Sequence, residues 1–393
     1  MARARPCTRP PGRALGRCGF DFRLVMEGSG AMRFFDAHCD TVMRVFDADL
    51  DFVQGRGRGH MDLPRLLAAG HRVQLFAVFA SHNYHASLDV RAYAEQAIGA
   101  IRGWVDASTG RMRLALSADD VTQACASADE RESDGENVWA LIGLEGADPL
   151  EGRAENLARF HELGVRNVIP AWDDNAFSGS SFGQGGPLTA EGYRLIEAAE
   201  ALRVMVDVSH LSDAAFDQVQ QIARRPFIAS HSNCRALCPS PRNLTDAQIR
   251  ALADCGGVMG INLSPDFLAA DYHVRWEAVM APLRTAALGP EAEARAAARQ
   301  KLREQVGPTL RAIPLPPVEW VARHVHHAIQ VGGEECIGLG GDLDGVAALP
   351  AGVTGVESYP LIVEALDAAG LTAGQVEKVC WRNMARVFVE VMA

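Results

Sequence analysis

Eight short apolar runs are spaced along the chain between residues 34 and 340. Most are continuous stretches of aliphatic or β-branched residues without alternation, which is typical of strands buried on both faces. They lie at residues 34–39, 73–79, 138–144, 165–171, 204–208, 226–230, 257–263 and 336–340. The pattern therefore predicts eight buried strands.

Helix-compatible stretches separate these runs. Residues 87–104, 151–163 and 188–202 fit helices, and Ser212 suits the N-cap of a helix over 213–223. Two Thr-x-x-Gln segments, beginning at Thr245 and Thr372, have the capping-box spacing. Strands that alternate with helices indicate parallel βαβ units, and eight of them favour a (β/α)8 TIM barrel of the α/β class over an open sheet.

Two regions depart from this alternation. Residues 265–316, between the seventh and eighth strands, include an Ala-, Arg- and Glu-rich stretch at 285–305, so we expect a helical insertion that caps the barrel. Residues 1–31 are rich in Arg, Pro and Gly and lack the apolar segment of a secretory signal. We expect a disordered extension there, with an organelle-targeting segment as the alternative and Met32 as a candidate start. Residues 32–393 are then expected to form a single catalytic barrel domain.

Composition and charge narrow the class of protein. The chain has 393 residues, of which 48% are hydrophobic and 22% charged, as in ordinary globular proteins. A net charge of -11 argues against nucleic acid as a partner, and no apolar run approaches the about 20 residues of a membrane span. Nine cysteines without a C-x-x-C pair indicate free thiols in a reducing compartment, so we expect a cytoplasmic protein.

Metal-capable side chains follow the first predicted strand. Residues two apart in a strand point the same way, so His38 and Asp40 would face one point at its end. Alone this H-x-D motif is weak, and the chain repeats it at His60-x-Asp62 with no strand in front. There we expect Asp62 to cap a helix through Leu67 and His60 to be a surface residue.

Further candidates stand where other strands end. Glu145 lies between glycines after the third strand, where a buried carboxylate is costly unless it has a partner, which could also be an arginine. His210 and His231 take the same relative place after the fifth and sixth strands, with two structural core histidines as the alternative. Asp342 follows the eighth strand in G-G-D-L-D-G, where a turn is the competing interpretation, above all for Asp344.

Together these positions offer three histidines and three carboxylates at one end of a barrel. Such a set suits a pair of divalent cations such as Zn²⁺. A glutamate can bridge two metals through its two oxygens, and paired metals activate water and polarise carbonyls. The natural chemistry of the predicted site is hydrolysis.

The motifs that hold these residues resemble those of the membrane (renal) dipeptidase family of binuclear zinc peptidases, in its bacterial form. In chain order they are F-D-A-H-C-D-T, L-E-G, V-D-V-S-H-L-S, P-F-I-A-S-H-S-N, P-R-N-L-T-D and G-L-G-G-D-L-D-G. The resemblance runs from Phe34 to the C-terminus. It implies a metallo-dependent-hydrolase barrel of the amidohydrolase-like superfamily, two Zn²⁺ per chain, and a homodimer.

The resemblance also implies a role for each metal-capable residue. His38 and Asp40 would bind one zinc, His210 and His231 would bind the other, and Glu145 would bridge the two. These assignments follow the family's motifs position by position.

Three more roles follow from the resemblance. Asp342 would accept a proton from the metal-bound water, which becomes the attacking hydroxide, and would later give that proton to the leaving amine. Arg242 would pair with the substrate's terminal carboxylate, which suits a guanidinium fork, with a structural arginine at a helix entry as the alternative. Trp172 stands where many members have a substrate-contacting histidine, and an indole donates one hydrogen bond but carries no charge.

We therefore expect a metal-dependent dipeptidase that hydrolyses dipeptides, including those with a C-terminal D-residue. A related barrel enzyme acting on an N-acyl amino acid, a lactone or a natural-product intermediate is the close alternative, because of Trp172 and the 265–316 insertion. A catalytically inactive scaffold barrel is the distant one, and it would lack ligands, whereas all five metal positions are filled.

Overall fold

The computed structural model describes residues 32–46, 51–57, 59–82, 84–85, 88–126, 137–286 and 306–393. The predicted extension at 1–31 and most of the predicted helix at 285–305 lie outside these described residues.

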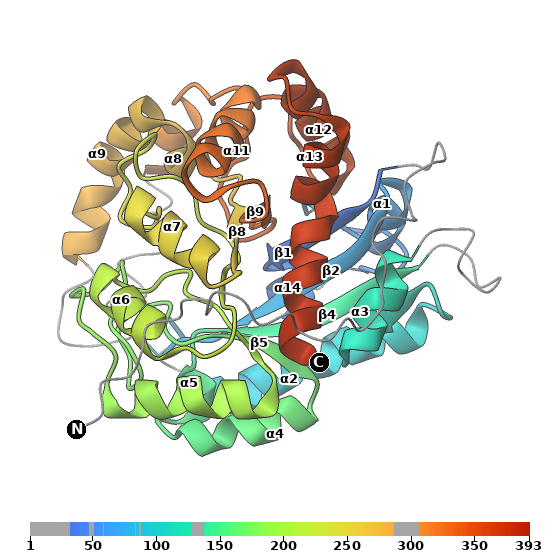
Figure 1. The fold of residues 1–393 in the computed structure, drawn as a ribbon, viewed down its shortest axis with the longest axis vertical. Helices are drawn as coiled ribbons and strands as arrows, with labels where there is room; N and C mark the ends of the chain where they lie inside the picture. Colours follow the sequence, from blue (N-terminus) through green and yellow to red (C-terminus); the bar gives the residue numbers. More distant parts are fainter. Residues whose placement is uncertain are drawn as a thin grey trace, which may run out of the picture.

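In the described chain, eight parallel strands form a nearly closed barrel (Figure 1). A parallel bridge between Asp207 and Ile228 joins the two ends of the strand order and completes the ring. Around the barrel the strands are β1 (Phe34–Cys39), β2 (His71–Phe79), β4 (Val138–Glu145), β5 (Val165–Ile169), β6 (Met205–Val206), β7 (Ile228–Ala229), β8 (Val258–Ile261) and β9 (Ile337–Leu339). The predicted (β/α)8 barrel is confirmed, and each predicted run overlaps one barrel strand, with β2 beginning two residues earlier and β4 ending one residue later than predicted.

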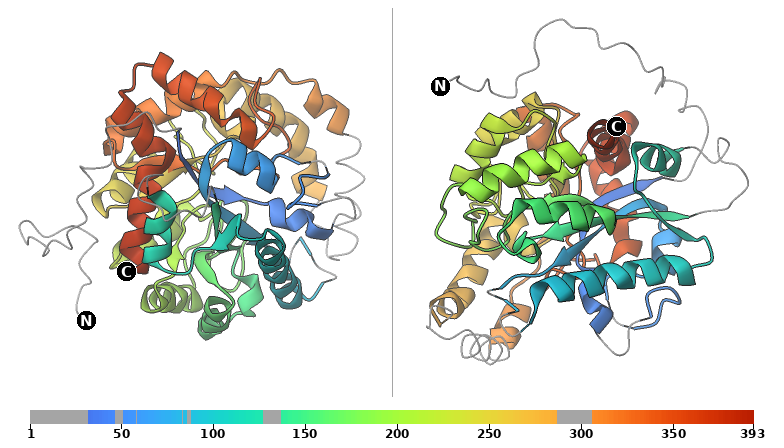
Figure 2. Two further views of the ribbon diagram at one scale, coloured as in Figure 1. Left: turned by 90° about the vertical axis from the view of Figure 1, so that its right-hand side faces the viewer. Right: turned by 90° about the horizontal axis from the view of Figure 1, so that it is seen from below.

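Helices surround these strands, as the two views of Figure 2 show. The α-helices are α1 (Leu63–Ala68), α2 (Val90–Ala107), α3 (Ala118–Cys125), α4 (Leu157–Glu162), α5 (Ala190–Leu202), α6 (Asp213–Ile222), α7 (Asp246–Asp254), α8 (Pro265–Leu268), α9 (Ala270–Ala286), α11 (Glu319–Gly332), α12 (Tyr359–Ala368), α13 (Ala373–Glu377) and α14 (Asn383–Met392). Shorter helical turns are η2 (Thr41–Phe46), η4 (Asp148–Leu150), η5 (Ala154–Asn156), η6 (Val356–Ser358) and η7 (Lys378–Arg382). All belong to the described residues.

The predicted caps account for several helix starts. Ser212 accepts the Ala215 backbone N–H at the start of α6, and the capping boxes that begin at Thr245 and Thr372 are both formed. Asp62 caps α1, as predicted. A side-chain oxygen at the N-cap satisfies a backbone N–H that has no partner inside the helix, which fixes where each helix begins.

One short strand was not predicted. β3 (Met112–Leu114) pairs with the start of β4, outside the ring of eight. Only its first residue is buried, and Arg113 interrupts its apolar residues, so the sequence carries no continuous apolar run that would indicate a strand.

The predicted insertion lies between β8 and β9. It contains α8, α9 and a small second core in which Ala269, Tyr272 and Ile313 pack with Trp276 and Trp320. Among the helices that the structure describes, none combines the length and apolar character that crossing a membrane requires.

Candidate functional site

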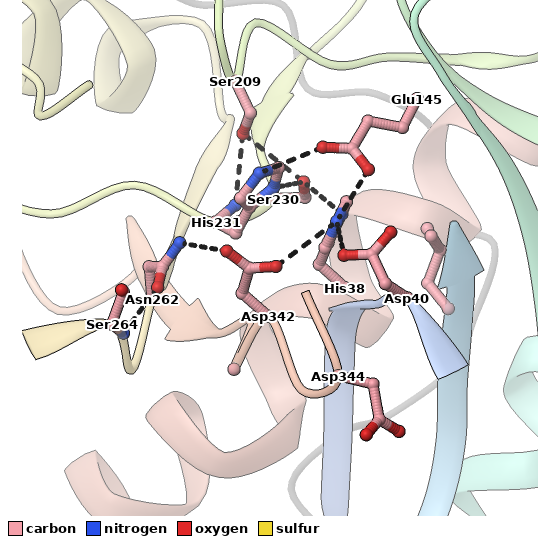
Figure 3. Close-up of polar contacts among 12 residues, drawn as sticks. His38, Asp40, Glu145, Ser209, Ser230, His231, Asn262, Ser264, Asp342 and Asp344 are labelled. Atoms are coloured by element: carbon pink, nitrogen blue, oxygen red, sulfur yellow. Dashed lines mark hydrogen bonds and ion pairs between the residues drawn. The ribbon is translucent and has the colours of Figure 1, made fainter. Parts of the chain in front are cut away.

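The six metal-capable side chains meet at the carboxyl ends of the barrel strands. His38 is the next-to-last residue of β1, Asp40 follows the strand, and Glu145 ends β4. His210, His231 and Asp342 stand in the turns after β6, β7 and β9. Figure 3 shows five of them, His38, Asp40, Glu145, His231 and Asp342, pointing toward one another. The barrel has therefore brought together residues that are up to 304 positions apart, from His38 to Asp342.

Glu145 divides its carboxylate between two sets of neighbours. Its Oε2 lies 3.5 Å from His38 Nε2, whereas its Oε1 lies 2.9 Å from His210 Nε2 and 3.8 Å from His231 Nε2. The glutamate thus turns one oxygen toward His38 and the other toward His210 and His231, an orientation that would suit a carboxylate shared by two cations.

The second set of donors lies around His38. Its Nε2 is 3.6 Å from Asp40 Oδ2 and 4.0 Å from Asp342 Oδ1. Two groups of donor atoms each fall within 4.8 Å of one another, one formed by His38, Glu145 and His231 and the other by His38, Asp40 and Asp342. His38 belongs to both groups.

Burial sets the protonation of these groups. Loss of solvation lowers the pKa of His210 and of His231 well below the ordinary value, so both rings are neutral and keep a lone pair for a metal. Burial opposes a charge on His38 as well, yet the Glu145 and Asp40 carboxylates raise its pKa well above the ordinary value. The surroundings of His38 Nε2 therefore favour positive charge at that point.

The donor set fits divalent cations such as zinc. His38 Nε2 is buried and makes no hydrogen bond within the described residues, and the Nε2 atoms of His210 and His231 approach to 2.8 Å. With ligand bonds of about 2.0–2.2 Å, tetrahedral donors lie roughly 3.3–3.6 Å apart, close to the spacings around His38. Ser230 Oγ, 2.8 Å from His231 Nδ1, leaves Nε2 of that ring as the atom that faces Glu145.

A buried carboxylate, Asp36, holds the backbone on the His38 side. Its Oδ1 accepts the N–H of His38 at 2.9 Å and its Oδ2 accepts the N–H of Gly341 at 2.9 Å. Tyr359 and Gln74 also donate to this carboxylate. Asp36 therefore connects the strand that carries His38 to the turn that carries Asp342.

Asp207 does the same on the opposite side of the centre. Its Oδ1 accepts the N–H groups of Ser209 and Ser230, both at 3.0 Å, and each serine immediately precedes a metal-capable histidine. Ser209 Oγ in turn accepts the N–H of His231 at 3.1 Å. Sequence reasoning missed both Asp36 and Asp207, although D-A-H and D-V-S-H show them close to the histidines.

Asn262 orients Asp342. Its side-chain amide donates to Asp342 Oδ2 at 2.8 Å, and its own carbonyl oxygen accepts the N–H of Ser264 at 2.7 Å. Asp342 has φ +57°, as His210 has φ +70°. Positive φ in residues other than glycine is costly and is found mainly where the surrounding structure holds a functional side chain in place.

The predictions for the second H-x-D motif are half right. Asp62 is a helix cap, but His60 is half-buried rather than a free surface residue: its Nδ1 accepts the N–H of Asp344 at 2.9 Å, and its own N–H donates to Asp344 Oδ1 at 2.8 Å. Asp344 Oδ2 also accepts the Thr41 hydroxyl at 2.6 Å. Asp344 thus ties the turn after Asp342 to two other loops, through contacts distant in the sequence that no local turn pattern could reveal.

Arg242 is buried beside the metal-capable residues. Its Nη2 donates to the His231 carbonyl at 3.2 Å, and its Nε has no partner within the described residues. Burial lowers the pKa of this guanidinium to about 10, so it is still charged at neutral pH. A buried, charged arginine with donors to spare suits the carboxylate of a substrate.

Trp172 belongs to an aromatic cluster next to His210. Its ring centroid is 4.8 Å from that of Phe79, 5.3 Å from Phe182 and 6.0 Å from both Tyr84 and His210. The structure thus places Trp172 at the site, where it offers an apolar face. Phe182 was not among the predicted site residues.

Comparison with known proteins agrees with this geometry. The family model described as membrane dipeptidase (peptidase family M19) matches residues 27–393. A protein of Klebsiella pneumoniae, named as an uncharacterized protein in the pqqA 5' region, is 32% identical over 75% of this chain and 95% of its own. A solved metallopeptidase structure, dipeptidase AC of family M19, is 25% identical with a TM-score of 0.75, covering 92% of this chain and 99% of that one.

A second solved structure shows a ligand. The metallopeptidase of Rhodobacter sphaeroides with a phosphinate mimic of the dipeptide L-Ala-D-Ala is 25% identical, with a TM-score of 0.73, over 92% of this chain and all of that one. The match of the family model across nearly the whole sequence, on a barrel that gathers the expected donors, shows that this chain belongs to the membrane dipeptidase family of metallopeptidases, peptidase family M19.

Proposed function

We propose that this chain hydrolyses the peptide bond of dipeptides, using two divalent cations, zinc in the first instance, at the centre formed by His38, Asp40, Glu145, His210 and His231. The observation that carries the proposal is the divided carboxylate of Glu145, with Oε2 toward His38 and Oε1 toward His210 and His231. Membership of a dipeptidase family supports the reaction type.

When bound there, the cations supply Lewis-acid activation of water and of the substrate carbonyl. The chain supplies the proton transfer. Burial raises the pKa of Asp342 well above the ordinary carboxyl value, and a base with a pKa nearer neutrality both accepts and returns a proton readily. Since Asn262 holds Oδ2, the oxygen available for transfer is Oδ1, which faces His38.

Arg242 explains why the substrate would be as short as a dipeptide. The guanidinium donates to the backbone carbonyl of His231, one of the proposed ligands. Its positive charge therefore lies about one residue away from the proposed metal centre. In a dipeptide, the terminal carboxylate is separated from the scissile nitrogen by one Cα. An anchor so close to the reacting carbonyl favours that spacing and excludes longer C-terminal segments.

The stereochemistry of the C-terminal residue is part of the proposal. The Rhodobacter relative binds a mimic of L-Ala-D-Ala, so we include dipeptides with a C-terminal D-residue among the substrates. An N-acyl amino acid is the second candidate, because Trp172 and its aromatic neighbours Phe79 and Phe182 offer apolar surface to an acyl chain.

The deciding experiment measures metal content and hydrolysis together. The purified protein is expected to hold about two zinc ions per chain and to cleave L,L- and L,D-dipeptides faster than N-acetyl amino acids. Asp342→Asn should keep the metal and lose turnover by about 10²–10⁴-fold, the range of general acid–base catalysis. Well under one metal per chain, or near-normal turnover by Asp342→Asn, would contradict the mechanism.

Two further features belong to the proposal. The seven described cysteines are free thiols, which supports a cytoplasmic location. A homodimer, implied by the family resemblance, stays a prediction that light scattering at several concentrations can test.

A further inference from the structure

Phe182 is an exposed aromatic ring at the proposed centre. Its side chain belongs to the few large apolar ones in the described chain that remain exposed, with 37% of its surface accessible. Its ring centroid lies 5.3 Å from that of His210 in an edge-on contact, and the Arg242 guanidinium carbon lies 5.7 Å from it. The ring therefore touches both a proposed metal ligand and the proposed carboxylate anchor.

The loop that carries Phe182 is fixed by several hydrogen bonds. Ser180 Oγ accepts the N–H of Phe182 at 3.2 Å, and Asp174 accepts the N–H groups of Ser180 at 2.7 Å and Gln184 at 2.6 Å. The N–H of Ser181 donates to the carbonyl of His210 at 2.7 Å. This last bond ties the loop to the backbone of the proposed ligand, so Phe182 keeps its place over His210.

Arg242 contacts two aromatic rings. Its guanidinium carbon lies 5.5 Å from the centroid of the Phe267 ring and 5.7 Å from that of the Phe182 ring. Phe182 differs from Phe267 in also contacting His210. Variants of the two phenylalanines therefore distinguish two effects. Both rings support Arg242, but only Phe182 of the two also borders the space between Arg242 and His210.

A dipeptide bound as proposed would pass along Phe182. Its terminal carboxylate would meet Arg242 and its scissile bond would lie near the ligands, so the Cα and side chain of its C-terminal residue would occupy the space between. We propose that Phe182 forms a wall of the subsite for that side chain and selects substrates whose C-terminal residue is apolar or aromatic. The inference rests on the proposed dipeptidase function and adds the class of residue that it prefers.

The physical reason is burial of apolar surface. An apolar side chain of the substrate that packs on the exposed Phe182 ring removes apolar surface from water, which favours binding. A C-terminal glycine has no side chain to cover the ring, so this free energy is not gained. Discrimination by an apolar pocket is typically about 10- to 200-fold. We expect the ratio of kcat/KM for Ala-Leu or Ala-Phe to that for Ala-Gly to fall about 10- to 100-fold in Phe182→Ala.

The test compares the zinc-loaded wild-type protein with the variants Phe182→Ala, Phe182→Leu and Phe267→Ala. The substrates are Ala-Gly, Ala-Leu and Ala-Phe, the last two with a C-terminal residue of either L or D configuration. Phe182→Leu should keep much of the preference, because it keeps an apolar wall. Phe267→Ala is the matched control and should change all substrates by one common factor. Metal content and circular dichroism establish that each variant is folded.

Each outcome decides the matter. A selective loss on Ala-Leu and Ala-Phe in Phe182→Ala supports the subsite. A uniform loss, equal to that of Phe267→Ala, or no loss, overturns it while leaving the dipeptidase activity intact. A wild-type protein that cleaves none of the dipeptides overturns the proposed function and the subsite together.

Discussion

Asn262 donates a hydrogen bond to Oδ2 of Asp342 at 2.8 Å, while Oδ1 of the same carboxylate lies 4.0 Å from His38 Nε2. Asn262 is itself fixed, since its backbone N–H donates to Asn233 Oδ1 at 3.0 Å and its side-chain Oδ1 accepts the N–H of Ser264. Figure 3 shows Asn262 approaching Asp342 from the side away from Glu145. One oxygen of the Asp342 carboxylate is thus held by Asn262, while the other faces His38.

Asn262→Ala should therefore impair turnover without removing metal. The variant frees Oδ2, so Asp342 can rotate away from the position in which Oδ1 faces the centre. We expect kcat to fall by roughly 10–100-fold, the usual effect of losing a supporting contact, with little change in KM. Steady-state kinetics with metal analysis measure this. Normal kcat in a metal-loaded Asn262→Ala protein would show that Asp342 needs no such support.

Asp36 and Asp207 make a matched pair for a second prediction. Each buried carboxylate accepts backbone N–H groups from two neighbouring strand ends, Asp36 next to His38 and Asp207 next to His210 and His231. At Asp36, whose two oxygens accept different N–H groups, an asparagine would turn a donor toward one of them. At Asp207, where Oδ1 accepts both N–H groups, an asparagine would remove the negative charge and turn its donor toward the Asn167 amide, which donates to Oδ2 at 3.4 Å. We expect zinc affinity to fall about 10–100-fold in each variant.

The two variants should affect different ions. Asp36→Asn should weaken the ion held by His38 and Asp40, and Asp207→Asn the ion held by His210 and His231. Titration with zinc against a competing chelator should show one weakened site in each variant and the other retained. Wild-type affinity at both sites in either protein would contradict a positioning role.

These carboxylates also mark the limit of what the sequence could reveal. The barrel was predictable because buried parallel strands leave continuous apolar runs, and because histidines and acids at strand ends are unusual within such runs. Asp36 and Asp207 sit inside the same runs, but their partners are backbone N–H groups on neighbouring strands. Those contacts depend on strand register in three dimensions, which no linear pattern encodes.

His60 was misjudged and Phe182 was missed for related reasons. His60 follows no strand and resembles a surface residue, yet it pairs with Asp344, which is 284 positions away. Phe182 lies in a Gly- and Ser-rich loop with no periodicity, and hydrogen bonds of this loop to Asp174, Ser180 and the His210 carbonyl place it at the centre. The metal-capable residues were accessible to sequence reasoning because their chemistry restricts residue type, whereas supporting residues are restricted by geometry alone.

Arg242→Lys provides a third prediction. Lysine keeps the charge but lacks the planar fork that binds a carboxylate through two hydrogen bonds, and it loses the contacts with Phe182 and Phe267. We expect KM for dipeptides to rise about 10–100-fold with a smaller change in kcat. Arg235→Lys is the control, because Arg235 lies on the same loop but pairs with Asp213. An unchanged KM in Arg242→Lys would remove Arg242 from the substrate site.

The last prediction concerns stability and a histidine away from the centre. His71 is fully buried at the start of β2, its ring packs against Phe34 and Tyr359, and neither ring nitrogen has a hydrogen-bond partner within the described residues. Burial, together with the nearby charge of Arg72, lowers its pKa to about 3. In the unfolded chain a histidine has a pKa of about 6.5.

Between these two pKa values the unfolded chain binds a proton at this position that the folded protein does not. Stability therefore falls as the pH drops below about 6.5, by roughly 1.4 kcal/mol per pH unit from this one group, until about pH 3. His71→Leu removes the titration, so its free energy of unfolding should decline less steeply with acid by that amount. It should also be no less stable at neutral pH, because two unpaired nitrogens leave the core.

Urea unfolding of both proteins at several values between pH 6.5 and 4.5 tests this. All other titrating groups are shared by the two proteins, so the quantity that matters is the difference in free energy of unfolding between them. A difference that grows as the pH falls is the expected result. If the two proteins lose stability with falling pH at the same rate, His71 accepts a proton in the folded protein at its ordinary pKa, and the prediction is wrong.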